Sequence, residues 1–331
     1  MSSSPSTPEG PGSVSDAPGQ PEGLADRLTG LAGDDSIEVR DGYAQVGDVR
    51  LHYVEAGDGP LVVLLHGFPE FWYGWRLQIK PLAAAGFRVV APDTRGYNLS
   101  SRPAGVAAYG ADKLADDIHG LIRELGAQSA FLVGHDWGGT IAWTVAMNHP
   151  EAVERLAILD AAHPRTLQKE LPHPGQLRRS WYFFYFALPG LPERHIRAGR
   201  FRFFRHFLRD ARPPFTSEEM DRYVEAWSQP GAVTAMLNYY RNSVRTPPKK
   251  AKAAIGPVSA PTLVIWGQRD RYLGPKLAEP DHDDVPNLDR VERLPEASHW
   301  VHHDESERVT QLLIDFFSPA GQTRTAKAST S

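Results

Sequence analysis

Residues 134–139, GHDWGG, place an aspartate at the centre of a glycine-rich turn. The turn follows the apolar run AFLV, so Gly134, Asp136 and Gly138 have the pattern of a nucleophile elbow, in which a sharp strand-to-helix turn lifts one side chain above a sheet. Glycine fits both flanking positions because larger side chains would crowd the turn. Free N–H groups at the start of the next helix favour an anion. Helix capping is the commoner role for a single aspartate before a helix, but the glycines favour Asp136 as a nucleophile.

A carboxylate in this position restricts the chemistry. Serine must lose a proton to a base before it attacks, whereas an aspartate, with a pKa of about 3.9, is already ionised at neutral pH. Its attack on an acyl carbon would give a reactive anhydride, but its attack on a saturated carbon gives an ordinary ester. Water can then cleave that ester at the carbonyl of Asp136. The expected reaction is therefore hydrolytic displacement at an sp³ carbon.

An acid and a histidine follow later in the chain. WGQRDRYL at 266–273 comes after a strand-like run and places Asp270 on a loop, and ASHWVHHDE at 297–305 does the same for His299. The order nucleophile, acid, histidine is that of the α/β-hydrolase fold. We expect His299 to take a proton from water while Asp270 fixes its tautomer and stabilises the imidazolium.

Other side chains compete for these two roles. Asp160, at the end of RLAILDA, is the alternative acid. His135 lies inside the elbow, and His302 and His303 are candidates for surface capping or pairing. Since these histidines lack the helical HExxH spacing of a metalloenzyme, we predict no metal.

The motif HGFP provides a further element of the site. The backbone N–H groups of Phe68 and Trp137 are predicted to form an oxyanion hole for ester hydrolysis, where loss of one donor costs about 10²–10³ in rate. The remaining residues of the motif are His66, Gly67 and Pro69.

Composition excludes several classes of function. The chain has 331 residues, no cysteine and a net charge of −4, so disulfides, thiolate metal sites and a cysteine nucleophile are excluded, and nothing favours nucleic acid or an anionic membrane as a partner. Residues 1–33 are rich in Ser, Pro and Gly, and with residues 320–331 they are expected to be disordered tails. We find neither a secretory signal nor a run long enough to span a membrane, so we expect a cytoplasmic protein.

The order of apolar runs predicts the fold. Continuous apolar runs bounded by turns suit strands buried on both faces of a parallel sheet, and helical patterns separate them here. We predict an α/β-hydrolase core at 34–162 and 251–319, with a mostly parallel sheet and helices on both faces. Residues 163–250 lack such runs and are expected to form an inserted helical cap. The predicted strands lie at 37–40, 49–57, 61–67, 87–93, 130–136, 155–161, 261–267 and 288–295, and the clearest helices at 111–126, 139–149 and 305–317.

The motifs together resemble those of the epoxide hydrolases in the α/β-hydrolase superfamily. The resemblance covers about residues 36–319 and is carried by HGFPEFWYGWR, PDTRGYNLSSRP, GHDWGG, WGQRDRYLG and ASHW, in that order. It implies a cofactor-independent enzyme that acts on a lipophilic epoxide and water. Haloalkane and haloacid dehalogenases share most of these motifs, including the elbow aspartate.

The resemblance implies two tyrosines in the cap that would bind and protonate the epoxide oxygen. FFYFALPG at 183–190 gives Tyr185, and LNYYRN at 237–242 gives Tyr240. Tyr182 and Tyr239 are close enough in sequence to be mistaken for them. Each tyrosine has the alternative role of a buried aromatic in the core of the cap.

Aromatic side chains are the expected walls of the substrate pocket. The predicted set is Trp72, Trp181, Phe184 and Phe186. We expect no cofactor, no nucleic acid partner and no membrane partner, and the sequence leaves a homodimer open. The hypothesis is hydrolysis of an epoxide to a vicinal diol, and the alternatives are a dehalogenase with the same triad or a non-catalytic binding protein on this scaffold.

Overall fold

The structure is a computed structural model that describes residue 28 and residues 30–318. The predicted tail at 320–331 and almost all of the predicted tail at 1–33 lie outside the described residues. None of the helices in the described part of the chain is both long and apolar enough to cross a bilayer.

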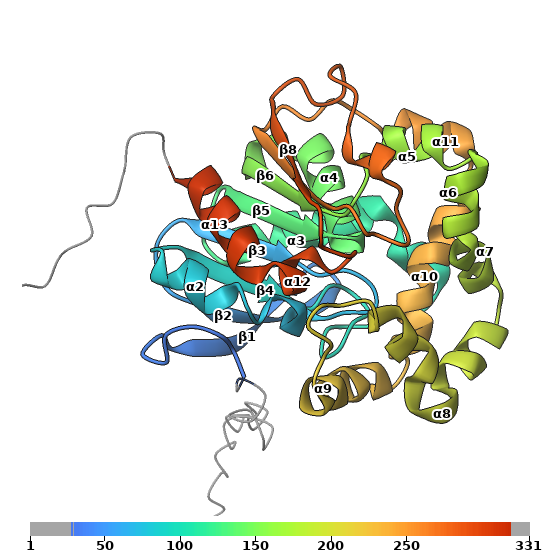
Figure 1. The fold of residues 1–331 in the computed structure, drawn as a ribbon, viewed down its shortest axis with the longest axis horizontal. Coiled ribbons are helices and arrows are strands. Elements are labelled where there is room, and N and C mark those ends of the chain that lie inside the picture. The colour runs from blue at the N-terminus through green and yellow to red at the C-terminus, as the bar shows by residue number, and fades with distance from the viewer. Residues whose placement is uncertain (1–27, 29, 319–331) are drawn as a thin grey trace, which may run out of the picture. The chain divides into compact units, whose positions relative to one another are not determined.

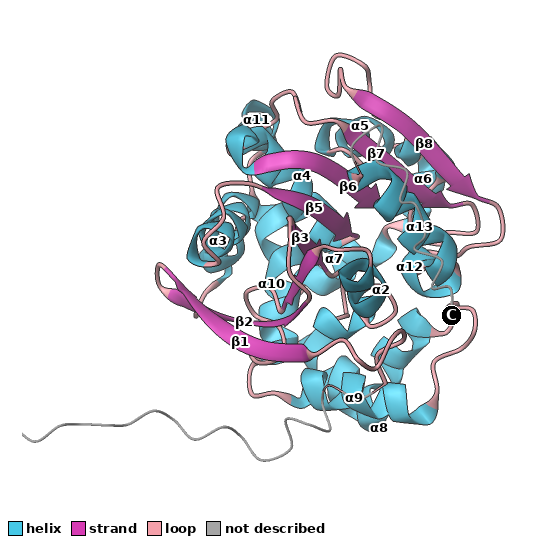
Figure 2. Cartoon of the chain, turned by 90° about the vertical axis from the view of Figure 1, so that its left-hand side faces the viewer, coloured by secondary structure: helices cyan, strands magenta, loops and turns pink. Residues whose placement is uncertain are grey.

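One sheet forms the centre of the core, as Figure 2 shows. It has eight strands. The second strand in the chain is antiparallel to both of its neighbours in the sheet, and the other neighbouring strands run parallel to one another. The strand order is β1 (Val39–Val46), β2 (Val49–Ala56), β4 (Arg88–Pro92), β3 (Leu61–Leu65), β5 (Ala130–His135), β6 (Val153–Leu159), β7 (Thr262–Gly267) and β8 (Leu288–Leu294). This confirms the predicted mostly parallel sheet.

Helices cover both faces of the sheet, which explains the uninterrupted apolar runs. Every residue of β3, β5 and β7 is buried, as expected for central parallel strands. Figure 1 shows α2 and α13 in front of the sheet with α3 and α4 behind it. The core helices are η1 (Trp72–Trp75), α2 (Ile79–Ala84), η2 (Val106–Tyr109), α3 (Ala111–Glu124), α4 (Trp137–Asn148), η3 (Pro150–Ala152), η4 (Pro275–Ala278), α12 (Val301–Asp304) and α13 (Ser306–Phe317).

A run of helices between β6 and β7 occupies the segment expected to be the cap. These helices are α5 (Pro164–Glu170), α6 (Pro174–Arg179), α7 (Trp181–Ala187), α8 (Leu191–Leu208), α9 (Ser217–Ser228), α10 (Ala232–Arg245) and α11 (Pro248–Ala253). They lie to the right of the sheet and below it in Figure 1. α8 is interrupted by non-helical backbone from Ala198 to Phe201. Because α11 ends at Ala253, the helical segment runs slightly past the expected boundary at 250.

Buried polar contacts attach the cap helices to the core. Trp227 in α9 donates its indole N–H to the carbonyl oxygen of Pro69 at 2.6 Å, and Tyr239 in α10 donates its hydroxyl to the carbonyl oxygen of Arg95 at 2.6 Å. Glu219, which forms a capping box with Thr216 at the start of α9, also accepts a bond from the buried Arg76 of the core at 2.7 Å. These bonds position α9 over the loop that follows β3 and α10 over the loop that follows β4.

Candidate active site

Asp136 stands between β5 and α4 with an unusual backbone conformation. Its φ is 50° and its ψ is −117°, a region that residues with side chains rarely adopt. Gly138, two residues after Asp136, permits the turn, because a Cβ there would collide with the backbone carbonyls of Leu65 and His66. Among the described residues, Asp136 makes no side-chain capping bond to α4, so helix capping is not its role.

Both oxygens of the Asp136 carboxylate face groups that suit a nucleophile. The backbone N–H of Phe68 donates to Oδ1 at 2.8 Å, and Nε2 of His299 lies 3.5 Å from Oδ2. The side chain of Asp136 keeps 15% of its surface accessible, whereas that of His299 keeps 4%. The backbone N–H of Trp137 lies in the first turn of α4, where helical N–H groups have no partner within the helix. The carboxylate is therefore held on one oxygen and available on the other.

Asp270 binds the far side of the His299 ring. Its Oδ2 lies 2.7 Å from Nδ1 of His299, while its Oδ1 accepts the backbone N–H groups of Tyr272 at 2.6 Å and Leu273 at 2.9 Å. With both oxygens occupied, the carboxylate cannot turn away from the histidine. The structure thus brings together the nucleophile, acid and histidine that were expected from the sequence.

Asp160, the alternative acid, lies nearby but bonds elsewhere. Its Oδ1 accepts the backbone N–H of Gly267 at 2.9 Å, and its Oδ2 has no hydrogen-bond partner among the described residues. Burial, followed by the negative charge of Asp270, raises the pKa of Asp160 well above its ordinary value. The raised pKa favours the uncharged form of Asp160, which makes it a poorer partner for an imidazolium than Asp270.

The charges around His299 determine its protonation state. Burial, the largest influence, lowers the pKa of His299, but the carboxylates of Asp270 and Asp136 together raise it well above its ordinary value. The two carboxylates therefore favour the protonated form of His299. Loss of the charge on Asp136 would remove part of what holds this proton.

Tyr240 lies where the sequence places it, over the elbow. It belongs to α10, is fully buried, and its ring centroid is 5.2 Å from that of Trp137 and 5.0 Å from that of Phe68. Burial first, and then the charge of Asp136, raises the pKa of Tyr240 well above its ordinary value of 10.0. Its hydroxyl therefore keeps its proton beside the carboxylate.

The second expected tyrosine, Tyr185, does not lie at the site. It is partly exposed, and its hydroxyl lies 2.8 Å from Nδ1 of His195, on the outer side of α7. Tyr182 occupies the inner side instead: it is buried, its ring is 6.0 Å from that of Tyr240, and burial and Asp136 raise its pKa well above 10.0. The prediction of Tyr185 is corrected to Tyr182.

Helical spacing explains this correction. Residues four apart share one face of a helix, so Tyr182 and Phe186 point inward together while Trp181 and Tyr185 point outward. The pattern Tyr-Phe-x-x-Pro-Gly selected a tyrosine by its distance from the Pro-Gly pair and ignored this periodicity. The same periodicity, applied to WYFFYFA, would have favoured Tyr182.

The chain is similar in sequence to known hydrolases. Residues 60–306 match the family model described as the alpha/beta hydrolase fold. The AB hydrolase superfamily protein YfhM of Bacillus subtilis (strain 168) is 44% identical over 281 residues, which cover 83% of this chain and 96% of that protein. Epoxide hydrolase 4 of Homo sapiens is 37% identical over 286 residues, which cover 83% of this chain and 78% of that protein.

Solved structures agree with these relatives. The epoxide hydrolase of Bacillus megaterium, in complex with an inhibitor, has 34% identity and a TM-score of 0.77, and the match covers 83% of this chain and 99% of that one. A mutant of the same enzyme in complex with its naphthyloxy-propanediol product has 33% identity and the same TM-score. The chain belongs to the epoxide hydrolases of the α/β-hydrolase superfamily.

The expected pocket aromatics of this epoxide hydrolase family member divide into inner and outer groups. Phe186 is buried, with its ring 5.0 Å from that of Tyr240, as expected of a pocket wall. Trp181 and Phe184 instead lie on the outer surface, 53% and 52% exposed, so their prediction as an inner wall is wrong. Trp72 is buried in η1, where its ring contacts are with Phe71 and Tyr73.

The HGFP motif acts mainly through its backbone and packing. Nε2 of His66 accepts the backbone N–H of Thr94 at 3.0 Å, which joins the loop after β3 to the loop after β4. Gly67 leaves space for the nucleophile, because a Cβ there would lie 2.6 Å from the Cβ of Asp136. These contacts hold the Phe68 N–H against the carboxylate.

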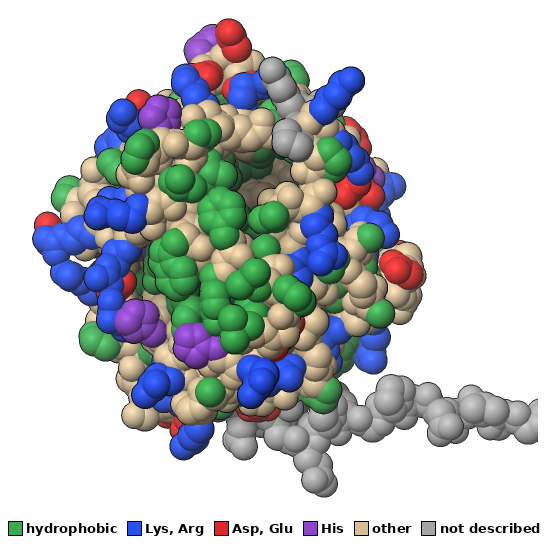
Figure 3. Space-filling model, turned by 90° about the vertical axis from the view of Figure 1, so that its right-hand side faces the viewer, with side chains coloured by type: hydrophobic (Ala, Val, Ile, Leu, Met, Phe, Trp, Pro, Cys, Tyr) green, Lys and Arg blue, Asp and Glu red, His purple; other side chains and the backbone are tan. Residues whose placement is uncertain are grey.

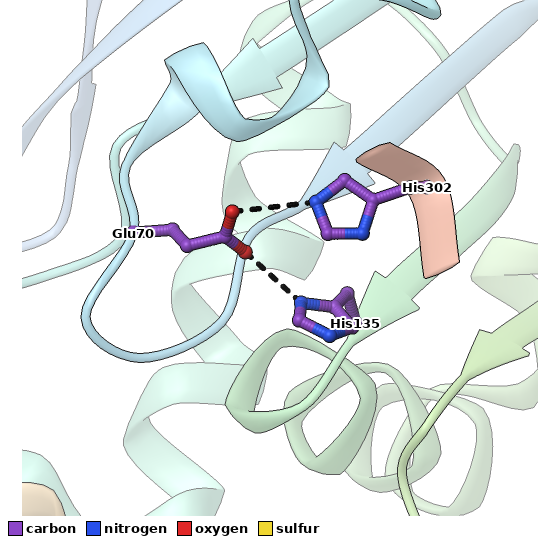
Figure 4. A group of neighbouring side chains, drawn as sticks. All are labelled: Glu70, His135 and His302. Atoms are coloured by element: carbon purple, nitrogen blue, oxygen red, sulfur yellow. Dashed lines mark hydrogen bonds and ion pairs between the residues drawn. The ribbon is translucent and has the colours of Figure 1, made fainter. Parts of the chain in front are cut away.

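A buried network around Glu70 was not predicted from the sequence. Figure 4 shows the Glu70 carboxylate between His135 and His302: Nδ1 of His135 lies 3.0 Å from one oxygen and Nε2 of His302 lies 3.3 Å from the other. Nε2 of His135 in turn lies 2.8 Å from the backbone carbonyl oxygen of His299. Burial alone would raise the pKa of Glu70, but the two histidines lower it well below its ordinary value. The network therefore anchors the loop that carries His299.

The same network bears on metal binding. The ligand atoms of Glu70, His135 and His302 lie within 4.8 Å of one another, as do those of His135, Asp160 and His299. Hydrogen bonds within the protein already use the facing atoms of Glu70 and both of its histidines. The group formed by Glu70, His135 and His302 therefore fits a hydrogen-bond network better than a metal site.

Proposed function

We propose that this enzyme hydrolyses a lipophilic epoxide to a vicinal diol through an ester on Asp136. The observation that carries the proposal is the position of two buried, protonated tyrosines, Tyr182 and Tyr240, next to the carboxylate. An epoxide oxygen leaves as an alkoxide, a strong base that requires an acid, whereas a halide requires none. Phe186 and Phe183, whose rings lie 5.0 Å from that of Tyr240, add an apolar surface for the rest of the substrate.

The first step is ring opening. Oδ2 of Asp136 attacks a ring carbon and forms a C–O bond, while the bond from that carbon to the epoxide oxygen breaks. The epoxide oxygen takes a proton from a tyrosine hydroxyl and becomes the first hydroxyl of the diol. The negative charge of Asp136 disappears in the ester, so the pKa of His299 falls and the histidine returns a proton to the tyrosinate.

The second step is ester hydrolysis. Neutral His299 takes a proton from water, and the resulting hydroxide attacks the carbonyl carbon of the Asp136 ester. The N–H groups of Phe68 and Trp137 stabilise the oxyanion on Oδ1. The diol oxygen leaves with a proton from His299, and the carboxylic acid of Asp136 then returns its proton to the histidine. Asp270 stabilises the imidazolium in the steps where it exists.

The nearest alternative is a dehalogenase, because the triad would serve both reactions. Parallel assays with styrene oxide and a bromoalkane separate the two functions. We expect diol from styrene oxide and no halide release, with diol formation abolished in Asp136→Asn. Halide release without diol formation would contradict the proposal and favour the dehalogenase.

A further inference from the structure

The cap contains a strongly cationic segment in an otherwise acidic protein. Residues 171–209 contain eight arginines, no lysine and a single acidic residue, Glu193, whereas the whole chain has a net charge of −4. Glu193 is itself paired with Arg241 at 2.8 Å. Arg200 and Arg205 lie 3.8 Å from Asp221 and Arg209 lies 3.7 Å from Asp210, so acidic side chains outside the segment offset only part of its positive charge.

The same segment exposes large apolar side chains. Exposed residues of this kind are concentrated in α6, α7 and the beginning of α8, and they are Leu177, Trp181, Phe184, Leu188 and Leu191, each between 43% and 57% exposed. We call the surface formed by residues 177–209 the cap face. Figure 3 looks onto this side of the molecule and shows hydrophobic side chains gathered beside a hollow, with basic (Lys or Arg) side chains and histidines around them. Exposed apolar clusters with a polar rim are typical of interaction sites.

A groove of about 780 Å³ opens on the cap face. Its floor includes Tyr272 and Phe207, whose rings stack at 5.4 Å with an interplanar angle of 5°. The Tyr272 ring lies 5.2 Å from that of His299, and the Phe207 ring lies 5.7 Å from that of Tyr182. One aromatic layer therefore separates the groove from the candidate active site. The arginines that line the groove are Arg178, Arg179, Arg202, Arg209 and Arg271.

Two of these arginines carry charge that the protein leaves unpaired. Arg271 forms an ion pair with Asp210 at 2.8 Å. In contrast, the exposed side chains of Arg178 and Arg202 form no ion pair with an acidic side chain among the described residues. A partner of negative charge is what these guanidinium groups would bind.

We propose that the cap face docks on the surface of an anionic lipid bilayer. Arginines would contact lipid phosphates while Trp181, Phe184 and the exposed leucines enter the boundary between headgroups and acyl chains, as in other interfacial proteins. A second copy of this chain fits the surface poorly, because two cap faces would bring like charges together. The expectation of no membrane partner rested on the net charge and on the interpretation of the basic amphipathic stretch at 200–210 as a helix packed on the core. Net charge does not reflect how the charge is distributed.

Docking would place the groove, and the active site beneath it, against the phase in which a lipophilic molecule is dissolved. This consequence rests on the proposed function, but the docking itself does not. The test of docking therefore uses the full chain with Asp136→Asn, so that binding is measured without turnover.

The first measurement is co-sedimentation with vesicles. We expect binding to vesicles made of equal amounts of phosphatidylcholine and phosphatidylglycerol, little binding to phosphatidylcholine alone, and release as salt is raised, because screening weakens the attraction. Equal binding to both vesicle types, or binding to neither, would overturn the proposal. Binding of soluble glycerol phosphate or polyglutamate without any binding to vesicles would also overturn the proposal.

Matched variants then locate the docking surface. Each basic residue near an anionic membrane contributes about 1 kcal/mol, or roughly fivefold in affinity, so Arg178→Gln with Arg202→Gln should weaken vesicle binding by about 20-fold. Leu188→Ser with Leu191→Ser should also weaken it. The control pair, Arg40→Gln with Arg308→Gln, removes the same charge from exposed positions outside the cap face and should bind like the parent. If the variant of Arg178 and Arg202 and the control variant bound vesicles equally, and both unfolded at the same midpoint as the parent, docking through this face would be contradicted.

Discussion

The charge of Asp136 affects each titratable group that would take part in the reaction. It contributes to the raised pKa of His299, of Tyr182 and of Tyr240, so all three hold their protons while the carboxylate is free. Formation of the ester removes that charge, and this lowers the affinity of all three groups for their protons. One residue would thus act as nucleophile and also convert its neighbours into a usable acid and a usable base.

The tyrosines provide a test at the scale of single residues. Tyr182→Phe removes a hydroxyl from the inner side of α7, and Tyr185→Phe removes the same hydroxyl from its outer side. General acids contribute about 10²–10⁴ in rate, so Tyr182→Phe should lower kcat for styrene oxide by at least tenfold, and Tyr185→Phe should leave it within about twofold. Steady-state kinetics of diol formation measure both. A large loss in Tyr185→Phe alone would restore the original assignment.

Single residues were predictable where a local motif determines them. Asp136, Asp270 and His299 were expected at one site because an elbow and the loops after two later strands are recognisable in sequence, and the structure brings the three side chains together. Tyr182 was not identified, because its role depends on which side of a short helix faces the core. Glu70 was missed because its partners, His135 and His302, are distant in sequence and meet only in the folded chain.

At the scale of elements, buried ion pairs of His52 join the antiparallel strands at one edge of the sheet. His52 on β2 places Nδ1 2.7 Å from Asp93, which follows β4, and Nε2 3.5 Å from Asp41 on β1. Burial lowers the pKa of His52, but Asp93 and Asp41 outweigh it and raise the pKa from 6.5 to about 9. The stability that His52 adds is therefore fully present below pH 6.5 and is lost as the pH rises to about 9.

This linkage can be measured by denaturation. A pKa difference of this size corresponds to about 3 kcal/mol of stability, so the free energy of unfolding should fall more steeply between pH 6.5 and 9 in the parent than in His52→Gln. Urea titrations at both ends of this range provide the values. The exposed His282→Gln is the control and should keep the parental slope. Identical slopes in the parent and His52→Gln would show that the network does not stabilise the fold.

Strands were predictable from the sequence where both of their faces are buried. Fully buried strands such as β3, β5 and β7 appear as continuous apolar runs, and the sequence located them within about two residues. The first strand was placed at 37–40 but spans Val39–Val46, because an edge strand with an exposed face lacks such a run. The interruption in α8 could not be foreseen from its amphipathic pattern.

At the scale of the whole molecule, the proposed reaction requires two parts of the chain at once. The core provides the nucleophile, acid and base from the loops after β5, β7 and β8, and helices α7 and α10 provide the tyrosines. Contacts such as Trp227 with Pro69 and Tyr239 with Arg95 hold these parts together. The order of apolar runs predicted a helical segment between the strands at 155–161 and 261–267, but not which of its side chains reach the core, since those contacts join residues far apart in the chain.

The covalent ester on Asp136 is the central claim, and isotope labelling in a single turnover tests it most directly. Excess enzyme is mixed with styrene oxide in heavy-oxygen water, and the diol and the peptide containing Asp136 are analysed by mass spectrometry. The account predicts an unlabelled first diol, with the heavy oxygen in the Asp136 side chain, because water attacks the ester carbonyl. Heavy oxygen in the first diol, with none in Asp136, would contradict it.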